Sequence, residues 1–150
     1  MKTWWEQNIM HFEPEEFADP DHYGSGEYAD KAMVLCLDDL RDVIGHGIRT
    51  TASAGGAVDV TGTHGHSKQS YHLWENGAKA IDFYIEDEMD VRDQVRMVLR
   101  SGFNGIGIYY NIWHDHKGVL LPVGFHGDMR PGKKFQVWSC RRKGEYVYLI

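Results

Sequence analysis

The sequence predicts an α+β fold in a single domain that spans residues 1–150. The chain of 150 residues fits one domain and is long enough to bury a core without disulfides or other cross-links. Apolar residues recur at helical spacing in the first third, whereas the second half breaks into short apolar runs separated by glycines and charges. Because the strands gather towards the end and do not alternate regularly with helices, we expect an antiparallel sheet with helices packed on one side.

The first predicted helix covers residues 28–44. Ala32, Leu35, Leu40 and Val43 recur there at helical spacing, and Gly45 is a typical stop. Residues 46–50 form a short predicted strand. The segment 51–71 is rich in Gly, Ser and Thr and is too long for a simple connection, which is typical of a functional loop.

The later elements are one helix and five strands. Residues 89–101 alternate apolar and charged positions and end at Gly102, which predicts a helix. Short apolar runs predict the strands, at residues 79–85, 105–110, 121–126, 134–138 and 145–150.

Composition excludes several classes of protein. The net charge of −6 and the pI near 5.8 argue against a partner made of nucleic acid. No apolar run reaches the roughly 20 residues of a membrane span. The N-terminus lacks the apolar stretch of a secretory signal. Two separated cysteines, Cys36 and Cys140, provide neither a disulfide framework nor a Cys-rich zinc site.

Histidine is abundant and clustered. Six of the nine histidines fall in two groups, His64, His66 and His72, and then His114, His116 and His126. Glycine-rich loops accompany both groups, which favours metal binding over isolated surface histidines. Histidine and aspartate without cysteine suit zinc in an open catalytic site.

Three residues are the candidate ligands. Asp82 is a carboxylate within an apolar strand, where burial is costly unless the group is paired or bound to a metal. His72 follows the long loop and precedes that strand. His126 lies near the end of a strand and is followed by Gly127, which permits close approach of a neighbouring strand or a substrate.

The motifs around these residues resemble a known family. Its pattern is Ser-x-His-x-x-Gly-x-Ala-x-Asp followed later by a strand with His-x-Asp. This chain has Ser70-Tyr71-His72, Gly77 and Ala80-Ile81-Asp82, and later His126-Gly127-Asp128. Gly47-Ile48-Arg49, Gly55-Gly56 and the strand Gly105-Ile106-Gly107 also follow the family order. Over residues 12–140 the chain resembles the zinc D-Ala-D-Ala carboxypeptidase family of peptidoglycan peptidases, in its small phage and bacterial form with the Hedgehog/DD-peptidase fold.

The resemblance implies a catalytic zinc ion held by His72, Asp82 and His126. We expect Asp128 to act as the general base, unless it only orients His126. The reserve candidates for the base are His116, His114 and Asp115. Arg49 is expected to hold a substrate carboxylate or the developing oxyanion, with a structural ion pair as its alternative role. Ser70 is expected to brace the ligand loop.

The expected substrate is the stem peptide of peptidoglycan, cut by carboxypeptidase or endopeptidase action at a bond that involves a D-residue. The missing signal fits a phage or prophage product, present in the host cytoplasm before release or associated with the virion, that acts on the cell wall. The motifs leave the oligomeric state open.

The chain departs from the family at several positions. Nine residues separate His72 from Asp82 where the family has six, and Val123 stands where some members carry an acid. These departures keep three alternatives open. The chain is a non-catalytic zinc-containing module that binds cell wall, or a phage structural component, or a different metal hydrolase that uses the His64-x-His66 and His114-x-His116 pairs.

Overall fold

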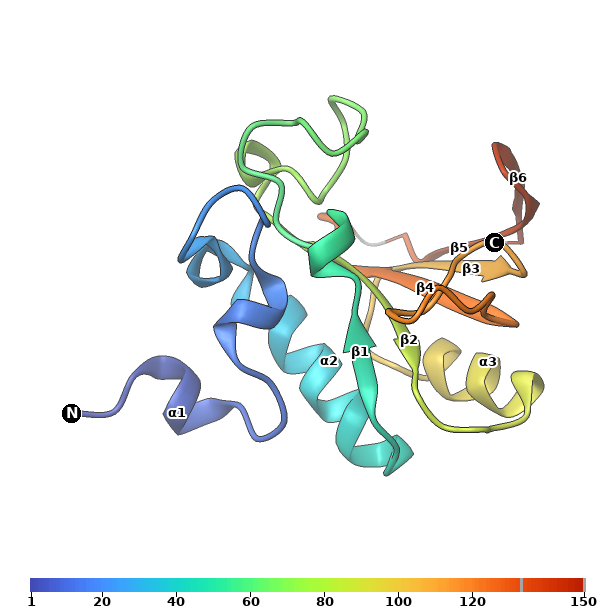
Figure 1. Ribbon diagram of the computed structural model, residues 1–150, viewed down its shortest axis with the longest axis horizontal. Coiled ribbons are helices and arrows are strands. Elements are labelled where there is room, and N and C mark those ends of the chain that lie inside the picture. The colour runs from blue at the N-terminus through green and yellow to red at the C-terminus, as the bar shows by residue number, and fades with distance from the viewer. Residues whose placement is uncertain (133, 150) are drawn as a thin grey trace.

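The computed structural model describes residues 1–132 and 134–149, and Figure 1 shows its helices beside one six-stranded sheet. The helices and 3₁₀ turns are α1 Trp4–Asn8, η1 Pro14–Phe17, η2 Ser25–Tyr28, α2 Lys31–Ile44, η3 Ala52–Ala54, η4 Trp74–Asn76 and α3 Val91–Leu99. The strands are β1 Ile48–Thr50, β2 Ala80–Ile85, β3 Gly105–Tyr110, β4 Val123–Asp128, β5 Gln136–Arg142 and β6 Glu145–Tyr148. The predicted α+β class is confirmed. Ile150, the end of the predicted strand 145–150, lies outside the described residues.

Local capping sets the bounds of the two long helices. Asp30 precedes α2, and its carboxylate accepts a hydrogen bond from the Met33 N–H at 3.1 Å. Gly45 ends α2 in the left-handed conformation that glycine adopts without strain. Asp90 caps α3 in the same way. Both helices lie within their predicted ranges and start later than expected.

The buried face of α2 differs from the predicted apolar stripe. Of the four spaced residues, only Leu40 is buried, while Leu35 and Val43 are 37% and 72% exposed. The buried positions form a second stripe, namely Met33, Val34, Leu37, Leu40 and Ile44. The N-terminal segment explains the choice, because Phe12 and Phe17 join the same core cluster.

The sheet is mixed, so the prediction of an antiparallel sheet is wrong in one place. Its strand order is β1-β2-β4-β3-β5-β6, and β3 pairs with β5 in parallel. The register shows the cause. Asp128 at the end of β4 and Gln136 at the start of β5 both lie opposite Gly105, the first residue of β3. Strands β4 and β5 therefore lie on opposite sides of β3.

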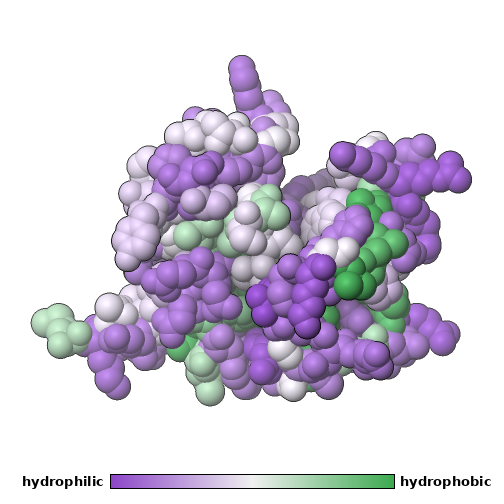
Figure 2. Space-filling view, in the orientation of Figure 1, coloured by the Kyte–Doolittle hydropathy of each residue, from purple (hydrophilic) through white to green (hydrophobic). Residues whose placement is uncertain are grey.

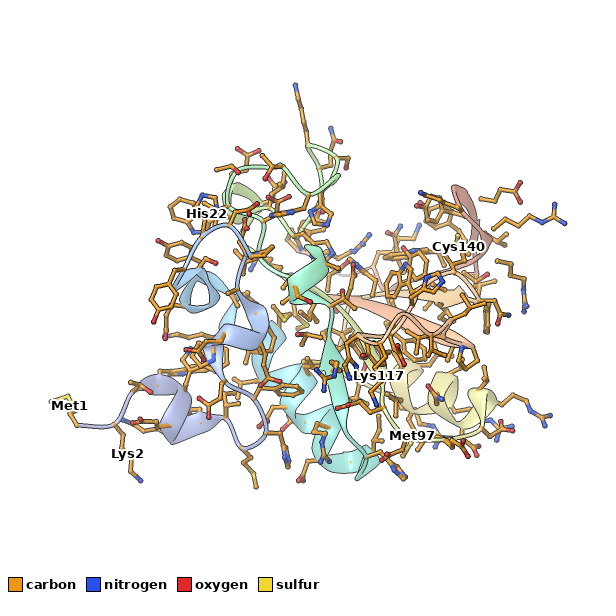
Figure 3. All side chains as sticks on the ribbon, in the orientation of Figure 1. Met1, Lys2, His22, Met97, Lys117 and Cys140 are labelled. Atoms are coloured by element: carbon orange, nitrogen blue, oxygen red, sulfur yellow. The ribbon has the colours of Figure 1, made fainter. Side chains whose placement is uncertain are left out.

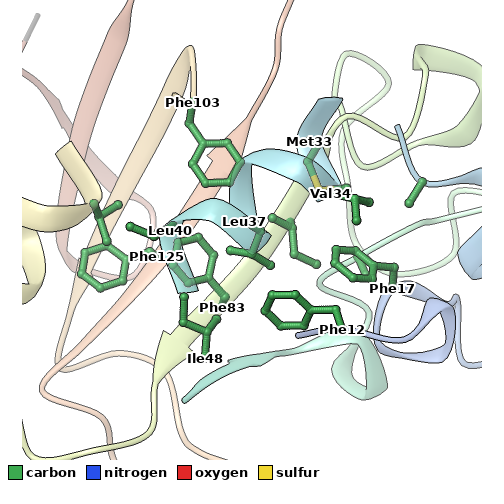
Figure 4. Packing of buried hydrophobic residues seen from close by; sticks show 14 of the residues in the cluster. Phe12, Phe17, Met33, Val34, Leu37, Leu40, Ile48, Phe83, Phe103 and Phe125 are labelled. Carbon is green, nitrogen blue, oxygen red and sulfur yellow. The ribbon is translucent and has the colours of Figure 1, made fainter. Parts of the chain in front are cut away.

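The hydrophobic core lies between the helices and one face of the sheet. Phe83 of β2 and Phe125 of β4 stack there with ring centroids 5.6 Å apart, beside Leu37 of α2 (Figure 4). Because side chains alternate along a strand, the residues between these core positions point to the other face. That opposite face carries the candidate site.

The surface is mostly hydrophilic, with one hydrophobic area on the right side of the view in Figure 2. All four residues of β6 are exposed. Within the described ranges, every helix is too short or too polar to cross a bilayer.

Candidate metal centre

Two neighbouring strands place Asp82 and His126 side by side. In the antiparallel pair of β2 and β4, these two residues lie directly opposite each other. Directly paired residues point to the same face, here the face without helices. The Asp82 Oδ1 lies 3.0 Å from the His126 Nδ1. The pairing of the strands thus fixes two of the three predicted ligands.

His72 reaches the same point from the long loop. Its Nδ1–H donates to the Ala57 carbonyl at 2.9 Å, which leaves Nε2 as the free lone pair. That Nε2 lies 3.3 Å from the Asp82 Oδ1. The His72 backbone N–H donates to the Ser70 hydroxyl at 3.2 Å, as expected for a brace of the ligand loop.

These three side chains could hold a metal ion. One donor atom from each of His72, Asp82 and His126 lies within 4.8 Å of the other two. Two imidazoles and one carboxylate form a donor set that zinc uses in sites with an open position. Burial works to raise the pKa of Asp82, but the two histidines outweigh it and hold that pKa well below its usual range. The carboxylate is therefore ionised, as a ligand must be.

An ion pair beneath the site holds His126. The His126 Nε2 lies 2.8 Å from the Asp128 Oδ2, so each ring nitrogen faces a carboxylate. Asp128 is fully buried and pairs in a bidentate manner with Arg130, at 2.8 Å to Nε and 2.6 Å to Nη2. Arg130 also donates to Gln136. Gly105 makes room, because a Cβ there would lie 2.5 Å from the Asp128 carboxylate.

Charge stabilises this arrangement in both directions. Burial disfavours the charged form of His126, but Asp128 and Asp82 outweigh burial and raise the pKa of His126 to about 9. Burial also opposes ionisation of Asp128, and Arg130 followed by His126 outweighs it, so the pKa of Asp128 stays well below its usual range.

The Asp128 carboxylate lies between Arg130 and His126. Both its oxygens are occupied by Arg130 and His126. Two of the reserve candidates, His114 and Asp115, line a cavity together with Asp82. His116 bonds the Tyr84 hydroxyl at 2.9 Å, and Asp115 caps its own loop by accepting from the Val119 N–H.

Arg49 lies on the same face of the sheet as Asp82, but it is not among the residues that contact the three candidate ligands. On β1, Arg49 lies opposite Tyr84 of β2. Its Nε pairs with the Glu86 Oε2 at 3.3 Å. This ion pair matches the alternative role that the sequence left open for Arg49.

His66, which the sequence grouped with His64 and His72, is a neighbour of the centre. Its ring stacks on His72 at 4.2 Å between centroids, and its Nδ1 lies 2.8 Å from the Asp59 Oδ2. Burial and the charge of His72 lower the pKa of His66, although the buried Asp59 opposes this shift. The Asp59 carboxylate accepts the hydrogen bond from the His66 Nδ1–H.

His64 belongs to a separate group. Its Nε2 lies 2.9 Å from the Asp19 Oδ1 and 3.5 Å from the Asp21 Oδ2. The hydrogen bond to Asp19 raises the pKa of His64. This contact joins the long loop to the N-terminal segment around Asp19. Figure 3 labels His22 in that segment. The alternative ligand set built on the two His-x-His pairs therefore does not assemble, since His64 and His66 face different carboxylates.

Sequence reasoning also missed Arg130. The spacing allowed an ion pair, because Arg130 follows Asp128 by two residues. Its partner Gln136, however, comes from a strand whose position depends on the parallel pairing.

Two cavities lie beside the centre. The larger, of about 720 Å³, is lined by the three candidate ligands, by Asp128 and Arg130, and by the aromatic residues Tyr71, Tyr109, Trp138, Tyr146 and Tyr148. A second, of about 520 Å³, lies towards Gly55, Trp113 and Asp115. His66 and Asp82 line both.

No known protein family, curated protein or solved structure matches this chain.

Proposed function

We propose that this chain is a zinc-dependent peptidase that hydrolyses a bond in the peptidoglycan stem peptide. The observation that carries the proposal is the convergence of His72, Asp82 and His126 on one point. They come from a loop and two strands, and they follow the order of the motifs of the zinc D-Ala-D-Ala carboxypeptidase family. The cavity beside them provides space for a peptide.

The residues around the ligands hold them in place. Zinc at this centre would polarise the scissile carbonyl and activate water for attack at neutral pH. The Ala57 carbonyl fixes the His72 ring, and Asp128 fixes the His126 ring through Nε2. Such partners orient ligands and make them more basic. Arg130 in turn holds Asp128.

We assign the role of proton acceptor to His66. Asp59 keeps the proton of His66 on Nδ1, which leaves Nε2 as an acceptor, and His66 lines both cavities. This assignment replaces the general base first expected at Asp128. A proton that His66 takes from the attacking water can pass to the leaving amine, because His66 lines the cavity that would hold the cut bond.

Metal analysis coupled to digestion of isolated sacculi tests the proposal. The purified chain should bind zinc, and Asp82→Ala should remove the zinc of this centre together with all hydrolysis. Product masses should show a cut within the stem peptide. Asp93→Asn is the matched control, since Asp93 is exposed on α3 and forms a surface ion pair with Arg96.

Full zinc occupancy in Asp82→Ala would overturn the ligand assignment. Zinc bound by the native chain, with intact sacculi after prolonged digestion, would instead overturn the peptidase.

A second candidate is a zinc-containing module that binds cell wall without cutting it, as a wall-binding or phage structural component. One observation favours it. Val123, where some family members carry an acid, is buried in the core at 1% exposure. In that case sacculi should retain the protein in a pelleting assay and release no peptide.

A further inference from the structure

We propose that Asp19, Asp21 and His64 form a second metal site, which takes zinc or a similar divalent transition-metal ion. The site is separate from the centre at His72 and joins the N-terminal segment to the long loop. One donor atom from each of the three residues lies within 4.8 Å of the other two. The His64 Nε2 lies 2.9 Å from the Asp19 Oδ1 and 3.5 Å from the Asp21 Oδ2. Such separations suit neighbouring donors on a tetrahedral zinc ion with bonds of about 2.0–2.2 Å.

Asp19 is a buried carboxylate that lacks a strongly basic partner. Its side chain is fully buried, and among the described residues its ion pairs are with His22 and His64, not with a lysine or arginine. Burial opposes ionisation, but hydrogen bonds from the backbone N–H groups of Val60 and Asp21 and from His64 outweigh it and lower the pKa of this carboxyl to about 2. A buried carboxylate is stable when it is paired or bound to a metal, and an ionised one binds a metal without losing a proton.

A nitrogen without a partner lies against the same carboxylate. Within residues 1–132 and 134–149, one buried side-chain nitrogen or oxygen lacks a hydrogen-bond partner, and it is the His22 Nδ1. It lies 3.4 Å from the Asp19 Oδ2, and one turn holds both residues, since the His22 N–H donates to the Asp19 carbonyl at 3.0 Å. An unpartnered buried nitrogen is destabilising. An ion on the Asp19 carboxylate would remove this cost, with His22 as the fourth ligand after a turn of its partly exposed ring.

The fold also holds His64 in position. Gly55 adopts the left-handed conformation, and a Cβ there would lie 2.7 Å from the His64 Cβ, so glycine makes room for this side chain. The Asp59 carboxylate accepts hydrogen bonds from the N–H groups of Gly62 and Thr63, which shapes the turn before His64. Ligands supported in this way are preorganised for binding.

The donor set favours a transition metal over calcium. Calcium prefers oxygen ligands throughout, whereas imidazole suits zinc and its neighbours. An ion at this site would also restrict the loop beside the first centre, because His66 follows His64 by two residues and stacks on His72.

Metal counting tests the proposal. The native chain should bind two zinc ions in equilibrium dialysis with elemental analysis, and Asp82→Ala should keep one. Addition of Asp21→Asn to Asp82→Ala should weaken the remaining ion by at least the roughly 10- to 100-fold that loss of a supporting residue alone causes. His22→Gln should weaken it as well. Asp42→Asn is the matched control, because Asp42 is 65% exposed, against 66% for Asp21, and also pairs with a histidine.

Thermal melts add a measurement that a simple ion pair would not affect. In the Asp82→Ala background, zinc at a hundredfold excess over its Kd should raise the melting midpoint by about 5–10 °C. Asp21→Asn should abolish this increase and leave the metal-free midpoint unchanged, since the side chain is exposed. Calcium at the same concentration should have no effect.

The outcomes separate this inference from the proposed function. One zinc ion in the native chain and none in Asp82→Ala would overturn the second site and leave the peptidase untouched. Zinc that binds Asp82→Ala with equal affinity after Asp21→Asn would also overturn it. A midpoint increase with calcium equal to that with zinc would refute ligation by His64. Two zinc ions without any hydrolysis of sacculi would overturn the peptidase and leave the second site standing.

Discussion

Replacement of Asp128 by asparagine separates its two candidate roles. The side chain is fully buried, and its carboxylate joins Arg130 to His126. Breaking a buried ion pair costs about 3–5 kcal/mol, and asparagine still accepts one hydrogen bond, so we expect a loss of about 3 kcal/mol in unfolding free energy. His126 also loses its orienting carboxylate. Loss of such a partner lowers metal affinity by about 10- to 100-fold.

The measurements are urea unfolding of the metal-free protein and competition for zinc with a chelating dye. Both should change in Asp128→Asn, and neither should change in Asp93→Asn, whose side chain is exposed. Native stability and native zinc affinity together with lost hydrolysis would refute this reasoning. That combination would return the role of general base to Asp128.

Three further predictions follow from contacts of the centre. Because the folded protein raises the pKa of His126 from 6.5 to about 9, the stability it contributes is present below pH 6.5 and is lost as pH rises through 9. In metal-free protein the unfolding free energy should therefore fall by about 3 kcal/mol between these values, measured by urea unfolding across the pH range. Gly107→Ala should destabilise the protein by about 1–3 kcal/mol, because its Cβ collides with Trp138, and a thermal melt with unchanged midpoint would contradict this. Arg49→Ala should retain zinc and stability, since its partner Glu86 is half-exposed, and elemental analysis with thermal melts checks both.

The sequence was sufficient for elements that local patterns define. The strand at residues 105–110 has its predicted bounds as β3, and Gly45 ends α2 as expected. The face of α2 could not be read from the chain, because two apolar stripes were available. Which of them is buried depends on Phe12 and Phe17, which lie more than ten residues before the helix.

The site shows the same limit. Asp82 could be singled out because a carboxylate within an apolar strand calls for a partner. The sequence left two roles open for Asp128 and two for Arg49, and it could not choose between them because each choice depends on a partner brought by folding. The parallel pairing of β3 and β5 places Gln136 beside Arg130. The pairing of β1 with β2 brings Arg49 close to Glu86, which follows β2.

Because Asp82 lies opposite His126, the two donors come together only when β2 and β4 pair in the native register. A slip of one residue between β2 and β4 would turn one of these two side chains into the apolar layer and separate the donors. Metal present while the chain folds would therefore bind only the correctly aligned sheet and would draw misaligned forms towards it. An ion bound at this centre would therefore also favour the native register of β2 and β4 during refolding.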